Sequence, residues 1–158
     1  MVNYKRFTFS FNFYVSWGGL VYNDLKRYLS SWGGNTHRQW PEYIVTGWKY
    51  QGQITPWYAV DTRNRKTANR ASLSNFYLED GSFIRLRNVR LSYTLDSKLI
   101  EKTFLKGVTA YVYGNNLMTW TNYTGYDPEV GGGVLTPGKD SGAYPRNREI
   151  GLGLNLNF

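Results

Sequence analysis

The most constraining feature of the sequence is a strict alternation of residue types over its last nine positions. In residues 150–158 (IGLGLNLNF), apolar side chains occupy every second position, and Gly or Asn stands between them. Because successive side chains of a β-strand point to opposite faces, this segment predicts a strand with one continuous apolar face. A water-soluble sandwich covers such a face with a second sheet, whereas a transmembrane barrel points it at lipid.

Three other segments repeat this two-residue period, and the sequence therefore predicts strands at about residues 4–17, 83–95, 107–118 and 149–158. The first alternates over eleven residues with an aromatic bias, and a tilted transmembrane strand needs about 9–11 residues. Five consecutive apolar positions of this kind suit a surface that faces lipid. A terminal strand that ends on Phe158 is typical of bacterial outer-membrane barrels.

The segment 83–95 changes parity in the middle. Ile84 and Leu86 are apolar at even positions, whereas from Val89 onward the apolar residues stand at odd positions. A period of two changes phase only where a residue is inserted, so we predict a β-bulge near residues 87–88. In segment 107–118 the lipid-facing side is ambiguous, and we expect Tyr111 and Tyr113 to face outward.

The connections between the expected strands are long, short and long. Residues 18–82 and 119–148 are the long ones, and residues 96–106 form a short turn that holds a helix around 97–104. This order is typical of an antiparallel barrel wall, in which extracellular loops alternate with compact periplasmic turns. A sandwich has connections of about 2–6 residues, so a loop of about 65 residues counts against it.

Composition excludes several classes of protein. The chain has 158 residues, 18% aromatic residues, no Cys and a formal charge of +8. The absence of Cys excludes disulfides, Cys-based zinc sites and thiol catalysis. No stretch approaches the roughly 20 apolar residues of a membrane helix, although alternating strands escape that test. Residues 1–6 do not resemble a signal peptide, so an exported chain is expected to belong to a longer polypeptide.

Three segments resemble the SusC/RagA family of TonB-linked outer-membrane transporters. They are residues 77–95 (YLEDGSFIRLRNVRLSYTL), 112–130 (VYGNNLMTWTNYTGYDPEV) and 144–158 (YPRNREIGLGLNLNF), about half of the chain. The resemblance implies a 22-stranded barrel with an N-terminal plug, of which this chain would be the last four strands. It further implies contact with TonB through the plug region, a SusD-like surface lipoprotein as partner, and the outer membrane of a Gram-negative bacterium as location.

An open sheet edge in lipid would leave backbone groups unpaired, and four strands cannot close a barrel. Further strands are therefore expected at both edges. One alternative is a soluble, basic, aromatic β-domain that binds polysaccharide or nucleic acid. Another is a barrel subunit that carries no cargo. The first alternative requires the Phe side chains of residues 7–13 to pack into a protein core.

Aromatic and apolar residues supply the candidate functional positions. Five loop aromatics are candidates for contact with a ligand or lid protein, or for a small core of the loop itself: Trp32, Trp40, Trp48, Trp57 and Tyr58. Trp17 and Trp120 lie at strand ends, where membrane barrels carry aromatic girdles. The expected barrel-insertion signal comprises Leu152, Leu154, Leu156 and Phe158.

We expect no catalytic site, metal or cofactor. His37 is the only histidine, so a Ser-His-Asp triad and a histidine-based metal cluster are improbable. Residues 133–139 mimic a phosphate-binding loop, but Asp140 follows where the motif requires Ser or Thr. Turn chemistry explains Asp127 and Glu129 better than a glycosidase pair or a calcium site does.

Overall fold

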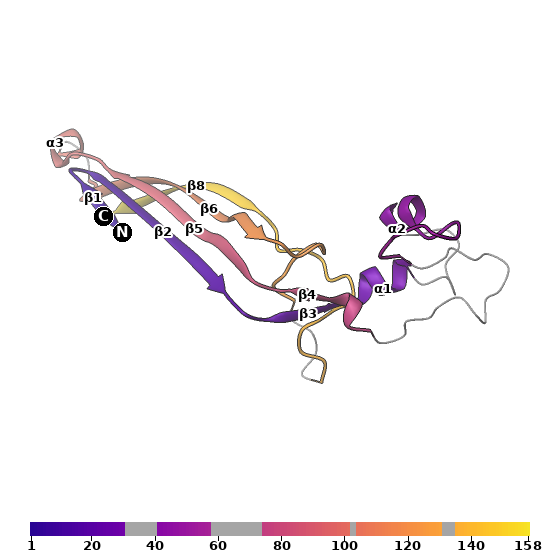
Figure 1. The fold of residues 1–158 in the computed structure, drawn as a ribbon. Helices are drawn as coiled ribbons and strands as arrows, with labels where there is room; N and C mark the ends of the chain where they lie inside the picture. Colours follow the sequence, from indigo (N-terminus) through magenta and orange to yellow (C-terminus); the bar gives the residue numbers. More distant parts are fainter. Residues whose placement is uncertain (31–40, 58–73, 102–103, 131–134) are drawn as a thin grey trace. The chain divides into compact units, whose positions relative to one another are not determined.

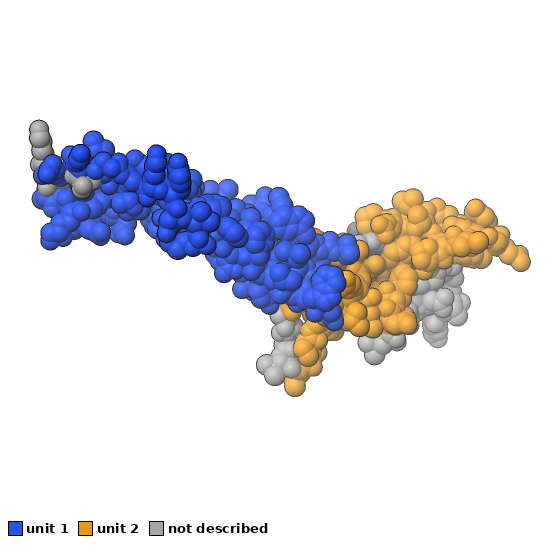
Figure 2. All heavy atoms as spheres, turned by 60° about the vertical axis from the view of Figure 1, so that its left-hand side comes forward, with its two compact units in different colours: residues 1–18, 82–122, 145–158 blue, residues 19–81, 123–144 orange. Residues whose placement is uncertain are grey.

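The computed structural model describes residues 1–30, 41–57, 74–101, 104–130 and 135–158 (Figure 1). The chain divides into two compact units (Figure 2). Unit 1 comprises residues 1–18, 82–122 and 145–158, and unit 2 comprises residues 19–81 and 123–144. No helix within the described residues is both long and apolar enough to span a membrane.

Unit 1 is a twisted antiparallel sheet of five strands, which confirms the predicted all-β antiparallel class. In sheet order the strands are β1 (Val2–Tyr4), β2 (Phe7–Ser16), β5 (Phe83–Thr94), β6 (Gly107–Thr121) and β8 (Glu149–Asn157). The strand expected over residues 4–17 is present as β2 but begins only at Phe7, because the chain reverses at Lys5 and Arg6 and residue 4 belongs to β1. Lys5 has a φ of 53°, as a tight turn requires.

The predicted β-bulge lies in β5 at Arg87. On the β2 side, Asn12 pairs with Asn88 and the next residue, Phe13, pairs with Leu86, so Arg87 is left over. The register also shifts at this point between β5 and β6. Because the bulge takes up this extra residue, Leu86 and Val89 lie on the same face although they are three positions apart, and the sequence therefore changes parity here.

A compact turn joins β5 to β6. It contains α3 (Ser97–Ile100), which is shorter than the helix expected over residues 97–104. The Asp96 carboxylate caps this helix by accepting a hydrogen bond from the backbone N–H of Lys98 at 3.1 Å, and it forms an ion pair with Arg6 of the β1–β2 turn. Within unit 1, α3 and both chain termini lie at the same end of the sheet (Figure 1).

Unit 2 has secondary structure that the sequence did not predict. Its sheet has the order β4 (Leu78–Asp80), β3 (Leu20–Asn23) and β7 (Lys139–Asp140). Its described residues also include two helices, α1 (Asp24–Ser30) and α2 (Pro41–Thr46), and a 3-10 helix, η1 (Asn75–Tyr77). The parallel pair of β3 and β7 joins the two segments expected as separate loops. The sequence does not predict this pairing, because strands of two to four residues are too short to show a period.

Aromatic side chains form much of the core of unit 2. Tyr43, Trp57 and Tyr77 are buried. Edge-on ring contacts link Tyr43 to Trp57 at 5.8 Å between centroids, Trp57 to Phe76 at 5.3 Å, and Phe76 to Tyr77 at 5.2 Å. These rings hold α2, the segment after it and η1 together.

Candidate functional site

One side of the unit 1 sheet is apolar across its strands, and we call it the apolar face. Three rows cross β2, β5, β6 and β8 in register: Phe7, Tyr93, Ala110 and Leu154; Phe9, Leu91, Val112 and Leu152; Phe11, Val89, Gly114 and Ile150. Two further rows cross β2, β5 and β6: Phe13, Leu86 and Met118; Val15, Ile84 and Trp120. The apolar positions of the individual strands therefore form one continuous surface.

The apolar face is open rather than packed. The side chains of Phe7, Phe9, Phe11 and Phe13 are 39–48% exposed, and Leu152 is 85% exposed. Between β5, β6 and β8 this face forms a shallow hollow lined by apolar residues that include Leu91, Val112 and Leu154. A soluble sandwich would cover these Phe side chains with a second sheet. No described element covers them.

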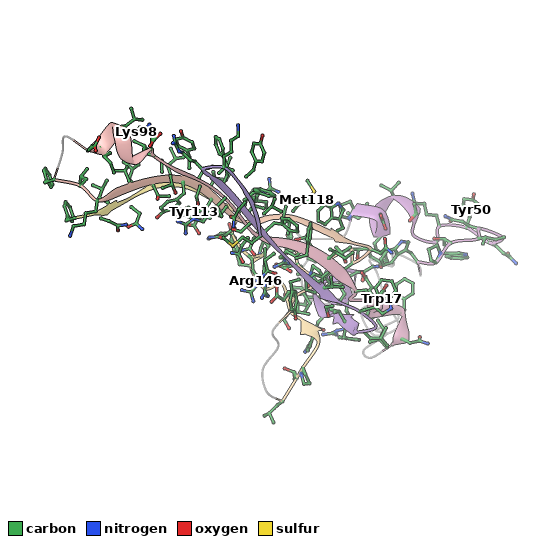
Figure 3. The ribbon with its side chains drawn as sticks, turned by 90° about the vertical axis from the view of Figure 1, so that its left-hand side faces the viewer. Trp17, Tyr50, Lys98, Tyr113, Met118 and Arg146 are labelled. Atoms are coloured by element: carbon green, nitrogen blue, oxygen red, sulfur yellow. The ribbon has the colours of Figure 1, made fainter. Side chains whose placement is uncertain are left out.

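The opposite side of the sheet is the polar face. Its rows are Thr8, Ser92, Tyr111 and Gly153; Ser10, Arg90, Tyr113 and Gly151; Asn12, Asn88, Asn115 and Glu149. The expectation that Tyr111 and Tyr113 face outward with the apolar residues is wrong. Figure 3 shows Tyr113 and Met118 of the same strand on opposite sides of the sheet. Tyrosine has a polar tip, so its ring alone does not tell the two faces apart.

Arginines of β5 lie over aromatic rings on the polar face. The Arg87 guanidinium carbon is 4.1 Å from the ring centroid of Tyr14, and that of Arg90 is 3.8 Å from the ring centroid of Tyr111. Both distances are within the range of cation–π attraction. The bulge is what brings Arg87 onto this face.

The two tryptophans expected in a girdle lie at one end of the sheet. Trp17 follows the last residue of β2 and is 85% exposed. Trp120 lies near the end of β6, which extends to Thr121 rather than to the predicted Met118, and its ring contacts that of Phe13 at 6.3 Å. Their position fits a girdle, which remains a prediction.

The expected insertion signal forms the outer strand β8. Leu152, Leu154 and Leu156 lie on the apolar face, and each is exposed. The terminal ring of Phe158 stacks on Phe104 of the β5–β6 turn, with the two planes 3° apart and the centroids separated by 5.8 Å. A two-residue period does not predict this partner, because Phe104 lies in a turn outside any periodic segment.

In unit 2 a polar cluster joins its two chain segments. The Glu79 carboxylate accepts hydrogen bonds from Lys26 Nζ at 2.9 Å and from the backbone N–H of Thr124 at 2.9 Å. Burial alone would raise the pKa of Glu79, but the hydrogen bonds from Lys26 and Thr124 outweigh it and lower the pKa below its usual value. Fully buried Asn23 donates to the same carboxylate and caps α1 through Lys26.

A second buried contact lies between Tyr123 and Asp140. The Tyr123 hydroxyl donates to the Asp140 carboxylate at 2.6 Å, and burial together with this acceptor raises the pKa of Tyr123. The other Asp140 oxygen accepts from the backbone N–H groups of Gly142 and Ala143. Asp140 therefore organises the turn that follows β7, a role that suits a residue 1% exposed.

The loop aromatics differ in their exposure. Trp57 is 5% exposed and belongs to the aromatic core. Its indole therefore forms part of a small core of the loop, which is one of the two roles considered for the loop aromatics. Burial raises the pKa of its neighbour Tyr43 to about 12. Trp48 is 40% exposed and remains a candidate for contact with a ligand or lid protein. Trp32, Trp40 and Tyr58 lie outside the described residues.

The acidic residues considered for chemistry have structural contacts. Asp127 accepts a hydrogen bond from the backbone N–H of Glu129 at 2.9 Å, the local geometry of an Asx turn. Lys139, from the segment that mimics a phosphate loop, forms an ion pair with Asp24 at 3.1 Å. Within the described residues, no group of three or more His, Cys, Asp or Glu side chains is placed to hold a metal ion.

Comparison with known proteins identifies relatives along the whole chain. TonB-dependent receptor P39 of Formosa agariphila is 32% identical over 159 residues, and TonB-dependent receptor SusC of Bacteroides thetaiotaomicron is 28% identical over 166 residues. Each alignment covers 99% of this chain. Along its whole length, the chain is thus similar to TonB-dependent receptors, SusC among them. The sequence resemblance to this family is thereby confirmed, and these relatives are receptors rather than enzymes.

The chain spans only about 15% of the length of these SusC-like relatives. Solved structures of the RagAB peptide importer match its fold, with a TM-score of 0.76 in the open-open state and 0.78 in the closed-closed state. These matches are 24% identical to this chain in sequence, and each covers 98% of this chain and 16% of the matched importer chain. No protein-family model matches the chain.

Proposed function

We propose that this chain forms part of the transmembrane wall of a TonB-dependent importer in the outer membrane of a Gram-negative bacterium. The observation that carries the proposal is the sheet of unit 1, whose apolar face is continuous across β2, β5, β6 and β8 while its opposite face is polar. Lipid covers the first face and the aqueous interior of a barrel lies against the second.

The strand lengths support this assignment. β2 has 10 residues, β5 has 12, β6 has 15 and β8 has 9, against about 9–11 for a tilted strand that crosses the hydrocarbon core. The outer strands of the sheet, β1 and β8, pair with other strands of the whole barrel, because an unpaired edge in lipid costs several kcal/mol for each backbone group. The proposed barrel has 22 strands, and this segment supplies the last of them.

The soluble alternative is less well supported. A sandwich buries the Phe residues of its first strand, whereas Phe7, Phe9, Phe11 and Phe13 are exposed here. An exposed patch of this size on a soluble domain would favour association or aggregation. The relatives are also named as receptors rather than as soluble binding proteins.

The proposed orientation puts the β1–β2 turn, α3 and Phe158 on the periplasmic side, and it assigns the two long connections, residues 18–82 and 119–148, to extracellular loops. Compact turns are typical of the periplasmic side of such barrels, and longer loops of the outer side. In this arrangement Trp48 of unit 2 is available to a SusD-like lipoprotein or to cargo. The cargo is a glycan or a peptide, and import is driven by TonB through the plug of the whole receptor.

A test of the wall assignment uses single cysteines, because these 158 residues contain none and any Cys elsewhere in the whole receptor can first be replaced by Ser. Spin labels at Phe11→Cys and Leu152→Cys on the apolar face are compared with labels at Asn12→Cys and Ser92→Cys on the polar face, in the whole receptor within outer-membrane vesicles. Labels on the apolar face are expected to collide with dissolved oxygen more than with a water-soluble nickel complex. Labels on the polar face should show the reverse preference.

Two outcomes would contradict the assignment. Equal collision profiles for both faces would show that the sheet does not separate lipid from water. Immobile labels on the apolar face, protected from both reagents, would show that protein covers it as in a soluble core. The import role is tested separately by uptake of labelled glycan and peptide mixtures, which should require both this receptor and TonB.

A further inference from the structure

The apolar alternation of β8 leaves its register against β6 undetermined. Residues 150–158 repeat with a period of two, so a shift by two residues moves one apolar residue into the place of another. The apolar face stays apolar and the polar face stays small or polar after such a shift. A one-residue slip is excluded because it exchanges the faces, but a two-residue slip is not. Something other than hydrophobic pattern must choose the register.

Two tyrosines of β6 lie directly over two glycines of β8. Tyr111 pairs with Gly153 and Tyr113 pairs with Gly151. A Cβ added to Gly153 would lie 2.3 Å from the Tyr111 ring, and one added to Gly151 would lie 2.5 Å from the Tyr113 ring. Each ring therefore rests on the bare backbone of its glycine, in space that any other residue would fill. This is the reason for glycine at these two positions.

Either two-residue shift destroys this fit. In one direction Asn155 moves beneath Tyr111, and in the other direction Glu149 moves beneath Tyr113. Both of these residues carry side chains, so one ring is forced off the strand in each case. The two tyrosines at a spacing of two thus match the two glycines at the same spacing in only one register.

Polar contacts hold the tyrosines and the start of β8 in this arrangement. The Tyr113 hydroxyl donates to one oxygen of Glu149 at 3.0 Å, and Asn115 Nδ2 donates to the other oxygen at 3.0 Å. The Arg90 guanidinium lies over the Tyr111 ring. A shift by two residues moves Glu149 by about 7 Å along the strand, which is beyond hydrogen-bonding reach of both donors.

We propose that Tyr111 and Tyr113 are positioning residues that set the register of β8 against β6 by resting on Gly153 and Gly151. In the proposed barrel β8 is the strand that meets the rest of the wall, so its register determines whether the seam can close. The recognition element for assembly then includes two residues of β6 in addition to the apolar residues of β8. That second part rests on the proposed function, whereas the register statement stands on the contacts alone.

The test measures register directly by disulfide formation in the whole receptor. Ala110→Cys is combined with Leu154→Cys to report the native register, and with Leu152→Cys or Leu156→Cys to report the two shifted registers. The native pair should cross-link on oxidation and the shifted pairs should not. In a Tyr111→Ala, Tyr113→Ala background, the ratio of native to shifted cross-link should fall by about fivefold or more.

Matched variants separate the ring from other causes. Tyr111→Phe with Tyr113→Phe keeps both rings and should keep the native ratio. Tyr14→Ala removes a tyrosine of the polar face that lies over no β8 glycine, and Asn155→Ala alters β8 beside the pairs; both should leave the ratio unchanged. Gly153→Ala should lower the ratio, and adding Tyr111→Ala to it should not lower it further.

The proposal is overturned if the alanine variants retain the native ratio, or if Tyr14→Ala lowers it equally. It is likewise overturned if both phenylalanine replacements lower the ratio as much as alanine does, because the hydroxyl contacts would then set the register. The spin-label result at Phe11 and Asn12 is independent of this ratio. A sheet that is not in lipid but keeps its register would thus refute the proposed function and leave the register proposal standing.

Discussion

At the scale of single residues, function in this chain depends on what each side chain contacts rather than on its type. Trp57 and Trp48 are both loop tryptophans, yet one is buried among rings and the other is 40% exposed. Glu79 and Asp127 both lie in segments expected as loops, yet Glu79 of β4 is bonded to a cation, Lys26, and Asp127 closes an Asx turn.

Glu79→Gln should destabilise unit 2 by about 1–3 kcal/mol, because it removes a charge-assisted hydrogen bond and leaves Lys26 without its carboxylate. Hydrogen exchange of the amides of α1 and η1, in the whole receptor, measures the loss. Glu42→Gln, at an exposed position in α2, is the matched control and should have little effect. Equal exchange in both variants would contradict the role given to Glu79.

The same cluster predicts a pH dependence. The folded-state pKa of Glu79 is below its ordinary value of 4.5, so its stabilising contribution is complete above that pH and is lost as the pH falls through the lower, folded-state pKa. Protection of α1, corrected for intrinsic exchange, should therefore decrease on acidification below about pH 4.5. In Glu79→Gln this decrease in protection should be much smaller. If the variant showed the same pH profile as the original protein, the decrease would come from another titrating group.

Phe104→Ala should reduce assembly of the terminal strand, because it removes the ring on which Phe158 stacks, a contact worth about 1 kcal/mol. Heat-modifiable receptor in outer-membrane fractions measures assembly, and Phe158→Ala should reduce it at least as much. Leu99→Ala, an exposed residue of the same turn, is the control. Full assembly of Phe104→Ala would show that the stacked pair is dispensable.

At the scale of elements, the two-faced sheet depends on the bulge in β5. Without the bulge, Leu86 and Val89, which are three positions apart, would point to opposite faces. The bulge also adds an arginine to the polar face, where it contacts Tyr14. The sequence predicted this element correctly because a parity change is a local signal that needs no knowledge of the partner strand.

Insertion of an Ala after Arg90 should therefore be far more damaging than deletion of Arg87. Deletion of Arg87 removes the extra residue, so Leu86, Asn88 and Val89 alternate without a bulge and keep their faces against β2. The insertion has no bulge to take it up and turns Leu91 and Tyr93 to the polar face. Heat-modifiable receptor should fall to a small fraction for the insertion and stay much nearer the original level for the deletion. Comparable loss in both variants would mean that the side-chain parity of β5 does not govern assembly.

At the scale of the whole molecule, the chain is divided into two units with different cores. The apolar residues of unit 1 are largely exposed on one face, whereas unit 2 buries an aromatic cluster and a polar network of its own. Unit 2 is built from two segments that are distant in sequence, 19–81 and 123–144, joined by the pair β3–β7 and by the Glu79–Thr124 contacts.

Replacing residues 20–80 by a direct link should leave the wall able to assemble. The backbone N–H of Gly81 donates to the carbonyl of Gly19 at 2.8 Å, so the two ends of this segment already lie together. The variant should keep its heat-modifiable form in outer-membrane fractions and lose uptake of cargo. Complete loss of the assembled form would show that unit 2 is needed for folding of the strands.

The sequence by itself determined which residues share a face of each strand and where the bulge lies, because side-chain parity is set within a few residues of backbone. It left the face of Tyr111 and Tyr113 ambiguous, and our expectation for them was wrong. Only the tertiary structure decided which strand each tyrosine meets, that Gly151 and Gly153 lie beneath them, and that two loops form one unit. Those outcomes depend on contacts between distant segments, and a period of two carries no information about register or partner.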